Sequence, residues 1–282
     1  MKIGLAQIAP RLGNLPRNYD LHFVEIENAA KEKADLLVFP ELSLTGYTLK
    51  DLTEEVALDP AKDSRFQKLV AASRRLSLVV GFVEEKEKGL YYNSAAFLSA
   101  GRILHIHRKV FLPTSGMFEE GKFFAPGKNF TTFAAPSGKA GLMICRDFLH
   151  YSASYLLFAG GAEMVIVISS APGRGMSERA GFISGRMWEL MGEAISFFST
   201  SFVVYCNRVG FEDGLAFAGG SFIFSPAGEL LVKVPELEER TVFQEIRPED
   251  VRAARKKYPY KRDDKPEIIL EALKRIVRND ED

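Results

Sequence analysis

Three polar residues stand directly after apolar runs of strand length: a glutamate, a lysine and a cysteine. Glu41 follows DLLVFP, Lys109 follows RILHIHR, and Cys145 follows KAGLMI. Active-site groups of α/β proteins gather at the carboxyl ends of strands. A thiol can attack an amide carbonyl while a carboxylate moves the proton and an ammonium stabilises the developing oxyanion. The three residue types therefore suit amide hydrolysis, if the fold brings them together.

Each of these residues also has a purely structural interpretation. A glutamate or lysine after a strand is commonly solvated, and a cysteine after an apolar strand is more often a small buried hydrophobe. Cys206 has the same local setting in FVVYCNRVG. Position alone therefore does not identify the nucleophile.

The histidines and glycines indicate no other centre. His105 and His107 would share one strand face, but no Cys, Asp or Glu pattern completes a metal site around them. His150 is close to Cys145 in sequence, without a recognisable Cys-His protease signature. Phosphate-binding GxxxxGK[ST], GxGxxG and Gly-x-Ser-x-Gly motifs are absent from the sequence. The sequence predicts neither a metal nor an organic cofactor.

Composition and charge limit the class of protein. Hydrophobic residues make up 46% and charged residues 26% of the chain, and 37 basic residues balance 37 acidic ones. This balance argues against a general excess of basic charge for binding nucleic acid or a membrane surface. Two separated cysteines fit free thiols in a reducing compartment, and no signal region or membrane-spanning apolar run is recognisable. We therefore expect a soluble cytoplasmic protein with no nucleic-acid or membrane partner.

Strands and helices alternate along the chain. Compact apolar runs predict strands at KIGLAQIA, DLLVF, LSLVVGFV, KAGLMI, MVIVIS and FVVYC. Helical spacing predicts helices near 19–30, 60–75, 152–160 and 177–199. Two hairpins, turning at Ala100-Gly101 and at Pro226-Ala227-Gly228, imply mixed sheets. One hairpin in each half predicts two similar α/β halves, with the sheets inside and the helices outside.

No linker divides the sequence, so a single domain is expected over residues 1–282. It ends in a helical tail at about 265–282, in which Ile269, Leu273 and Ile276 share one face. This face predicts packing against the chain itself or a subunit contact.

Longer sequence segments indicate which residues are catalytic, a question that position after a strand leaves open. VFPELSLTGY, HRKVFLPTSGMFEEGKFFAPG and LMICRDF resemble the glutamate, lysine and cysteine blocks of the nitrilase (carbon–nitrogen hydrolase) superfamily. They occur in the family's order, with 68 residues from Glu41 to Lys109 and 36 from Lys109 to Cys145. The resemblance continues through GGAEMVIVIS, FVVYCNRVG and FAGGSFIFSPAGELL to YPYKRDDKPE, and so spans nearly the whole chain.

The resemblance implies a role for each matching residue. Cys145 would be the nucleophile, Glu41 the general base and Lys109 the cation that stabilises the oxyanion. Glu120 matches the second glutamate found beside these three, and is chosen over Glu119 because the family pattern is Phe-x-Glu. Lys109 is expected to favour the thiolate of Cys145, whose proton Glu41 would accept.

The resemblance also implies the architecture and assembly. The implied fold is a four-layer α-β-β-α sandwich with mixed sheets, which agrees with two α/β halves. No cofactor is implied. Family members commonly form dimers or larger assemblies, so a homo-oligomer is expected.

Arg146 stands where the family commonly has an aromatic or acidic residue. Its backbone N–H would help Lys109 hold the oxyanion. Its guanidinium could bind a substrate carboxylate, or could form a structural ion pair with Asp147 or Glu163. The residues expected to contact substrate are Arg146, Phe118, Ser170 and Trp188.

Among the family's reactions, the resemblance favours hydrolysis of a small amide, with water as second substrate and ammonia as product. Cys-Arg-Asp differs from the Cys-Trp-Glu usual in nitrilases. The PELSLTGY block is similar to the glutaminase part of glutamine-dependent NAD synthetases, although the Ser-Gly-Gly-x-Asp-Ser signature of their second domain is absent from this sequence. The alternatives are a hydrolase of N-carbamoyl compounds, a glutaminase subunit that supplies a separate synthetase, and a non-catalytic binding protein on the same fold.

Overall fold

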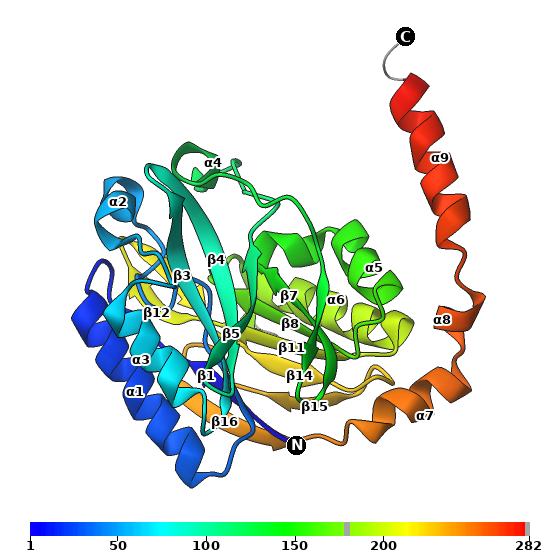
Figure 1. Cartoon of the computed structure of the whole chain (residues 1–282), viewed down its shortest axis with the longest axis horizontal. Helices are drawn as coiled ribbons and strands as arrows, with labels where there is room; N and C mark the ends of the chain where they lie inside the picture. The colour runs from blue at the N-terminus through cyan, green and yellow to red at the C-terminus, as the bar shows by residue number, and fades with distance from the viewer. Residues whose placement is uncertain (178–180, 280–282) are drawn as a thin grey trace.

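The computed structural model describes residues 1–177 and 181–279, which form two mixed six-stranded sheets packed face to face (Figure 1). The first sheet contains, in spatial order, β16 (Arg240–Glu245), β1 (Lys2–Gln7), β2 (Leu36–Val38), β3 (Ser77–Glu87), β4 (Leu90–Ser99) and β5 (Arg102–Arg108). The second contains β6 (Thr132–Ala135), β7 (Gly138–Ile144), β8 (Met164–Ser169), β11 (Phe202–Asn207), β14 (Phe222–Phe224) and β15 (Leu230–Lys233). Two further strand pairs are β9 (Met176–Ser177) with β10 (Gly181–Phe182) and β12 (Val209–Glu212) with β13 (Leu215–Ala218).

Both sheets have the same pattern of strand directions. In the orders given above, successive pairs are antiparallel, parallel, parallel, antiparallel and antiparallel. The two predicted hairpins, β4–β5 and β14–β15, form the last pair of each sheet. Ala100 and Gly101 both have positive φ, 51° and 72°, as a turn that follows the strand twist requires. The prediction of two similar α/β halves is confirmed.

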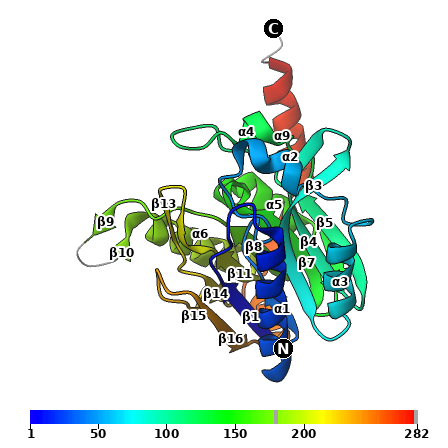
Figure 2. The same ribbon diagram turned by 90° about the vertical axis from the view of Figure 1, so that its left-hand side faces the viewer.

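Helices cover the outer face of each sheet (Figures 1 and 2). On β2, Val38 faces the second sheet, whereas its neighbour Leu37 lies in the cluster beneath the helices. Such burial on both faces explains the near-continuous apolar runs of the central strands. The covering helices are α1 (Leu15–Lys31) and α3 (Ser64–Ala72) on the first sheet, and α5 (Tyr151–Ala159) and α6 (Ile183–Ser199) on the second. The predicted four-layer sandwich is confirmed.

The helix predicted at 177–199 begins later, at Ile183. Phe182 and Met176 pair as antiparallel strand residues, and the Phe182 N–H donates to Glu236 Oε2 at 3.0 Å. The Phe182 N–H therefore bonds to a distant segment and not to a carbonyl of the predicted helix, so the helix begins after it. Residues 178–180, which the prediction also included, lie outside the described residues.

Further helices connect the layers or lie near the carboxyl ends of the strands. They are η1 (Lys50–Leu52), α2 (Thr53–Val56), α4 (Glu120–Phe123), η2 (Cys145–Leu149), α7 (Glu249–Lys257) and α8 (Tyr260–Asp263).

The last helix, α9 (Pro266–Asn279), extends away from the sandwich (Figure 1). Its predicted apolar face is solvent-exposed, with Ile269 at 38%, Leu273 at 52% and Ile276 at 59% exposure. Packing of this face against its own chain, one of the two expectations, is therefore wrong. Over the described ranges, no helix combines the length and apolarity that crossing a membrane demands.

Candidate active site

Glu41 lies in the loop that follows β2, and its carboxylate is fully buried. Its Oε1 accepts hydrogen bonds from Lys109 Nζ at 2.7 Å and Asn93 Nδ2 at 2.8 Å. Its Oε2 accepts from the backbone N–H of Ser170 at 2.7 Å. Asn93 belongs to the first sheet and Ser170 directly follows β8 of the second. Glu41 is thus a carboxylate fixed between the sheets and not a solvated loop residue.

The loop that carries Glu41 packs closely on β3. A Cβ atom at Gly81 would lie 2.5 Å from the backbone nitrogen of Leu42 and 2.6 Å from the carbonyl oxygen of Pro40. Glycine is therefore required at this contact. From the other side, the buried His22 ring lies 2.9 Å from Ser43 Oγ through Nε2, and burial lowers the pKa of His22 to about 4. A neutral histidine therefore supports the loop.

Lys109 bridges two carboxylates in the interior. Its Nζ donates at 2.7 Å to Glu41 Oε1 and at 2.7 Å to Glu120 Oε1, and the lysine side chain has no exposure. Burial alone would lower the pKa of Lys109, but the charges of Glu120 and Glu41 outweigh burial and raise it. A buried ammonium held by two carboxylates remains charged and fixed in position, as the stabilisation of an oxyanion requires.

Glu120, at the start of α4, is the second carboxylate of the cluster. Burial raises the pKa of Glu120 to about 7, against the opposing effect of Lys109. Its Oε1 also accepts from the Tyr47 hydroxyl at 2.6 Å, whereas its buried Oε2 has no hydrogen-bond partner among the described residues. Tyr47 itself is held by Glu212, whose Oε1 accepts from the Tyr47 N–H at 2.9 Å. Neither Tyr47 nor Asn93 is predicted from the sequence to be part of this site.

Cys145 begins η2 directly after β7, and its backbone is left-handed, with a φ of 45°. This conformation is uncommon for a residue with a Cβ atom, and it marks the turn as strained. Burial raises the pKa of the Cys145 thiol to about 12; Glu41 adds to the rise and Lys109 opposes it. Lys109 thus acts in the expected direction, towards the thiolate, but burial and Glu41 outweigh its effect.

The two cysteines differ in what they face. Cys145 lines a small pocket of about 130 Å³. Cys206 is completely buried, and its Sγ donates to the Val38 carbonyl at 3.1 Å between the sheets. Only Cys145, of these two, is open to a small molecule.

The pocket at Cys145 contains three of the four residues expected to contact substrate: Phe118, Arg146 and Trp188. Arg174, which the sequence analysis did not identify, lines it as well, and its guanidinium lies 5.2 Å from the centre of the Phe118 ring. Ser170 is placed differently. Its Oγ donates to the Glu41 carbonyl at 3.0 Å and its side chain is fully buried, so it supports Glu41 behind the pocket.

The structural ion pair considered for Arg146 is not formed. Asp147 accepts from His107 Nε2 at 2.8 Å, and Glu163 lies 3.7 Å from Arg255. Arg146 is exposed at the pocket and takes part in no ion pair with the described residues. Its guanidinium is thus available to a ligand.

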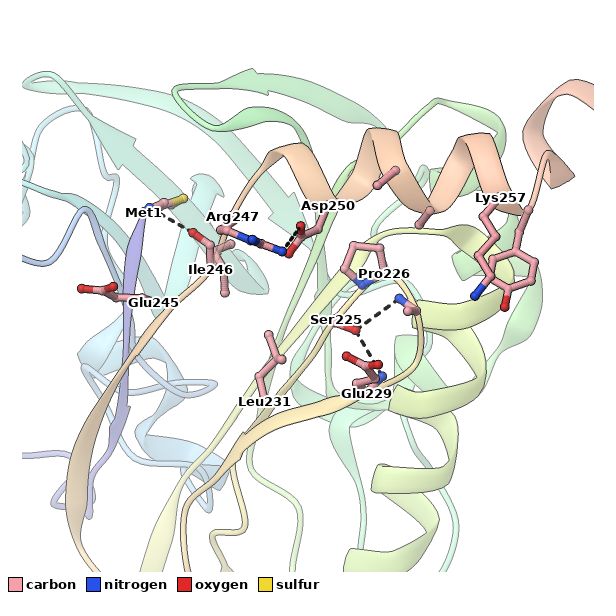
Figure 3. A pocket seen from close by; sticks show the side chains of 14 residues that line it. Met1, Ser225, Pro226, Glu229, Leu231, Glu245, Ile246, Arg247, Asp250 and Lys257 are labelled. Atoms are coloured by element: carbon pink, nitrogen blue, oxygen red, sulfur yellow. Dashed lines mark hydrogen bonds and ion pairs between the residues drawn. The ribbon is translucent and has the colours of Figure 1, made fainter.

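A larger cavity, of about 720 Å³, lies elsewhere, between the β14–β15 turn, β16 and α7 (Figure 3). Arg247 and Asp250 on its wall pair with each other at 2.9 Å, and Ser225 Oγ accepts from the backbone N–H groups of Ala227 and Glu229. Neither Cys145 nor the charged cluster borders it. Volume alone therefore does not make this cavity the active site.

Among the described residues, no cluster of His, Cys, Asp and Glu is arranged to hold a metal ion. His105 stacks on Phe133 with 4.5 Å between ring centres, and His150 stacks on Phe111 at 3.7 Å.

The family described as carbon-nitrogen hydrolase matches residues 2–256. An (R)-stereoselective amidase from a Pseudomonas species is 34% identical over 266 residues, which cover 93% of this chain and 91% of the amidase. A glutamine-dependent NAD(+) synthetase from Acinetobacter baylyi is 33% identical over 245 residues, which cover 87% of this chain but only 44% of the synthetase. The chain thus spans less than half the length of that relative.

One solved structure is similar to this chain over almost the entire length of both proteins. The carbon-nitrogen hydrolase from Helicobacter pylori superposes with a TM-score of 0.85 and 26% identity, and the match covers 97% of this chain and 98% of that one.

Proposed function

Since the chain belongs to the carbon–nitrogen hydrolase family, we propose that it hydrolyses a small amide through a thioester on Cys145 and releases ammonia. One observation carries the proposal. Lys109 bridges the buried carboxylates of Glu41 and Glu120, at 2.7 Å from each, and the charges of all three act on the thiol of Cys145. These contacts support Cys145, which lines the small pocket, as the nucleophile, Glu41 as the base and Lys109 as the oxyanion cation.

In the first half-reaction, Sγ of Cys145 attacks the amide carbonyl carbon. The thiol is neutral at pH 7, because burial raises its pKa to about 12. Glu41 therefore takes the thiol proton as the C–S bond forms. The carbonyl electron pair moves to oxygen, where Lys109 Nζ and the backbone N–H of Arg146 stabilise the negative charge.

The remaining steps, which complete acylation and then hydrolyse the thioester, use the same carboxylate. As the tetrahedral intermediate collapses, the C–N bond breaks, and the proton held by Glu41 passes to the leaving amine, which departs as ammonia. A water molecule then loses a proton to Glu41 and attacks the thioester carbonyl. Cleavage of the C–S bond returns that proton to sulfur and releases the carboxylic acid.

The substrate class follows from the pocket walls. A volume of about 130 Å³ suits a small acyl group, and Arg146 and Arg174 both line it. A guanidinium binds a carboxylate with paired hydrogen bonds. An amide that bears a carboxylate therefore fits better than an uncharged one.

Arg146→Ala and Arg174→Ala are expected to raise the KM for carboxylate-bearing amides about 10- to 100-fold, the value of one or two charge-assisted hydrogen bonds. The KM for uncharged amides of similar size should change less than about twofold. Steady-state kinetics on both amide types measures the difference, with the distant exposed Lys68→Ala as control. Equal effects on the two types would contradict carboxylate recognition.

The test of the proposed function is ammonia release from a substrate panel. The panel contains simple amides, ω-amides of dicarboxylates, glutamine, N-carbamoyl compounds and nitriles. Carbon dioxide released together with ammonia from an N-carbamoyl compound would favour the carbamoyl alternative. If a well-folded protein releases ammonia from no compound of the panel, the result would favour the non-catalytic binding protein.

A second candidate function rests on a specific similarity. The NAD(+) synthetase from Acinetobacter baylyi, which is named as glutamine-dependent, aligns with 87% of this chain. A glutaminase subunit that passes ammonia to a synthetase on another chain would show weak glutaminase activity alone and stimulation by that partner.

Both cysteines are free thiols, which supports a reducing compartment such as the cytoplasm.

The exposed helix α9 supports assembly of several copies. It has 14 residues, a length at which an isolated helix is marginal in water. An apolar groove of about 400 Å³ lies between α5 and α6, and Tyr260 of α8 packs beside it on Phe198, with 6.0 Å between ring centres. Helix face and groove occur on the same chain, so a second copy would offer each surface to the other.

Leu273→Glu is expected to convert this assembly to monomers, because it places a charge on the apolar face of α9. Arg275→Glu changes the same helix on another face and should leave the assembly intact. Light scattering coupled to gel filtration gives the molar mass of each variant. A monomeric wild type would contradict the assembly.

A further inference from the structure

Asp147 makes hydrogen bonds that no catalytic role proposed above requires. Its carboxylate is completely buried. Oδ1 accepts from the backbone N–H groups of Val110 at 3.1 Å and Phe111 at 2.9 Å. Oδ2 accepts from the backbone N–H of Ile144 at 3.1 Å and lies 2.8 Å from His107 Nε2. A carboxylate offers about four lone-pair positions, and here all are used.

These bonds join the two segments that carry the nucleophile and the cation. Val110 directly follows Lys109 after the first sheet, and Ile144, the last residue of β7 in the second sheet, directly precedes Cys145. One side chain therefore fixes the backbone beside Cys145 to the backbone beside Lys109. It also holds a turn in which Cys145 has an unfavourable φ of 45°.

We propose that Asp147, oriented by His107, is a positioning residue that sets the placement of the Cys145 thiol relative to the Lys109 ammonium. The inference rests on the proposed function, because it assigns these two groups to one reaction. His107 belongs to the strand that leads into Lys109 and is itself only 3% exposed. It donates through Nε2 and fixes the carboxylate plane, which leaves the remaining lone pairs directed at the three backbone groups.

The chemistry of the four donors explains why an amide would not replace the carboxylate. Three donors are backbone N–H groups, which cannot become acceptors. In an Asp147→Asn protein, the NH₂ group would meet at least one of them. Two donors then face each other in a buried place, so the turn at Cys145 or the segment after Lys109 must shift.

Asp147→Asn is expected to lower kcat on an uncharged amide about 100-fold, because a misplacement near 1 Å costs that much in an oriented reaction. KM should change less than about threefold, since the pocket walls remain. His107→Leu, which removes one donor and keeps the three backbone bonds, should lower kcat about tenfold. His107→Gln can restore an N–H donor and should recover most of that loss.

Asp63→Asn is the matched control. Asp63 also accepts two backbone N–H bonds, at the start of α3 and away from Cys145. It should lower stability without changing kcat. Full kcat in Asp147→Asn or in His107→Leu, or equal losses in His107→Leu and His107→Gln, would overturn the positioning role.

A second measurement separates this inference from the proposed function. Iodoacetamide is a small amide, and its rate of reaction with Cys145 can be followed by mass spectrometry without knowledge of the substrate. Alkylation should be about tenfold slower in His107→Leu than in wild type, with His107→Gln close to wild type. If no amide is hydrolysed but this order of rates holds, the proposed function fails and the positioning role stands. Equal alkylation rates in all three proteins would overturn the positioning role.

Discussion

Cys145→Ala is expected to reduce ammonia release from the best substrate by at least about 10,000-fold, because no other group can form the covalent intermediate. The substitution keeps the fold, since alanine fills most of the same space at the end of β7. Initial rates of ammonia release measure the loss. Intact mass spectrometry under turnover checks its cause: wild type should gain the mass of the acyl group and the variant should not.

Cys206→Ala is the matched control for this experiment. The Cys206 side chain is as deeply buried as any in the protein and bonds to the Val38 carbonyl between the sheets. Its loss leaves a small cavity and should lower stability by about 1 kcal/mol, with activity retained. Activity that survives Cys145→Ala, or that disappears only in Cys206→Ala, would refute the assignment of the nucleophile.

Lys109→Met is expected to abolish activity and to lower the free energy of unfolding by about 3 to 5 kcal/mol. Methionine has a similar length but no charge. It leaves the carboxylates of Glu41 and Glu120 buried without the ammonium that now donates to both at 2.7 Å. Urea denaturation followed by circular dichroism measures the change in stability.

The stability and the activity effects of Lys109 can be separated. Lys109→Met combined with Glu41→Gln and Glu120→Gln removes the whole charged cluster with similar side-chain volumes. This triple variant should regain most of the lost stability, since the neutral glutamine side chains can be buried without the ammonium. It should regain no activity. If Lys109→Met alone is as stable as wild type, the two carboxylates are not held as a charged cluster.

The sequence was sufficient for the parts of the fold that depend on local pattern. Apolar runs flanked by turn residues predicted the central strands, because each strand is buried on both faces. The hairpin at Ala100-Gly101 followed from its turn residues, which adopt the required positive φ. The start of α6 was wrong, because pairing of Phe182 with Met176 and the bond to Glu236 come from tertiary structure.

The ordered family blocks brought Glu41, Lys109, Glu120 and Cys145 into one hypothesis. In the structure, Lys109 bonds to Glu41 and Glu120 at 2.7 Å, and the charges of these three residues act on the Cys145 thiol. The residues that hold them had no comparable signal. Asn93 bonds to Glu41 across 52 residues and Tyr47 bonds to Glu120 across 73. Contacts of this kind depend on how the sheets pack, and no spacing in the sequence encodes them.

The contacts of Arg146 and His107 could not be predicted from the sequence either. Arg146 was considered a partner for its neighbour Asp147, but in η2 the two side chains take different directions. Asp147 turns inward to His107, 40 residues away, and Arg146 turns out to the pocket. His107 had been considered only as a metal ligand.

The site is divided between the two sheets: Glu41 and Lys109 follow strands of the first, and Cys145 and Ser170 follow strands of the second. The first sheet is moreover completed by β16, from the far end of the chain, which pairs with β1. A chain emerging from the ribosome thus presents its carboxylate and ammonium before its thiol, and these groups come together only when both layers have met. Under the proposed function, amide hydrolysis therefore requires that both sheets have formed and packed together.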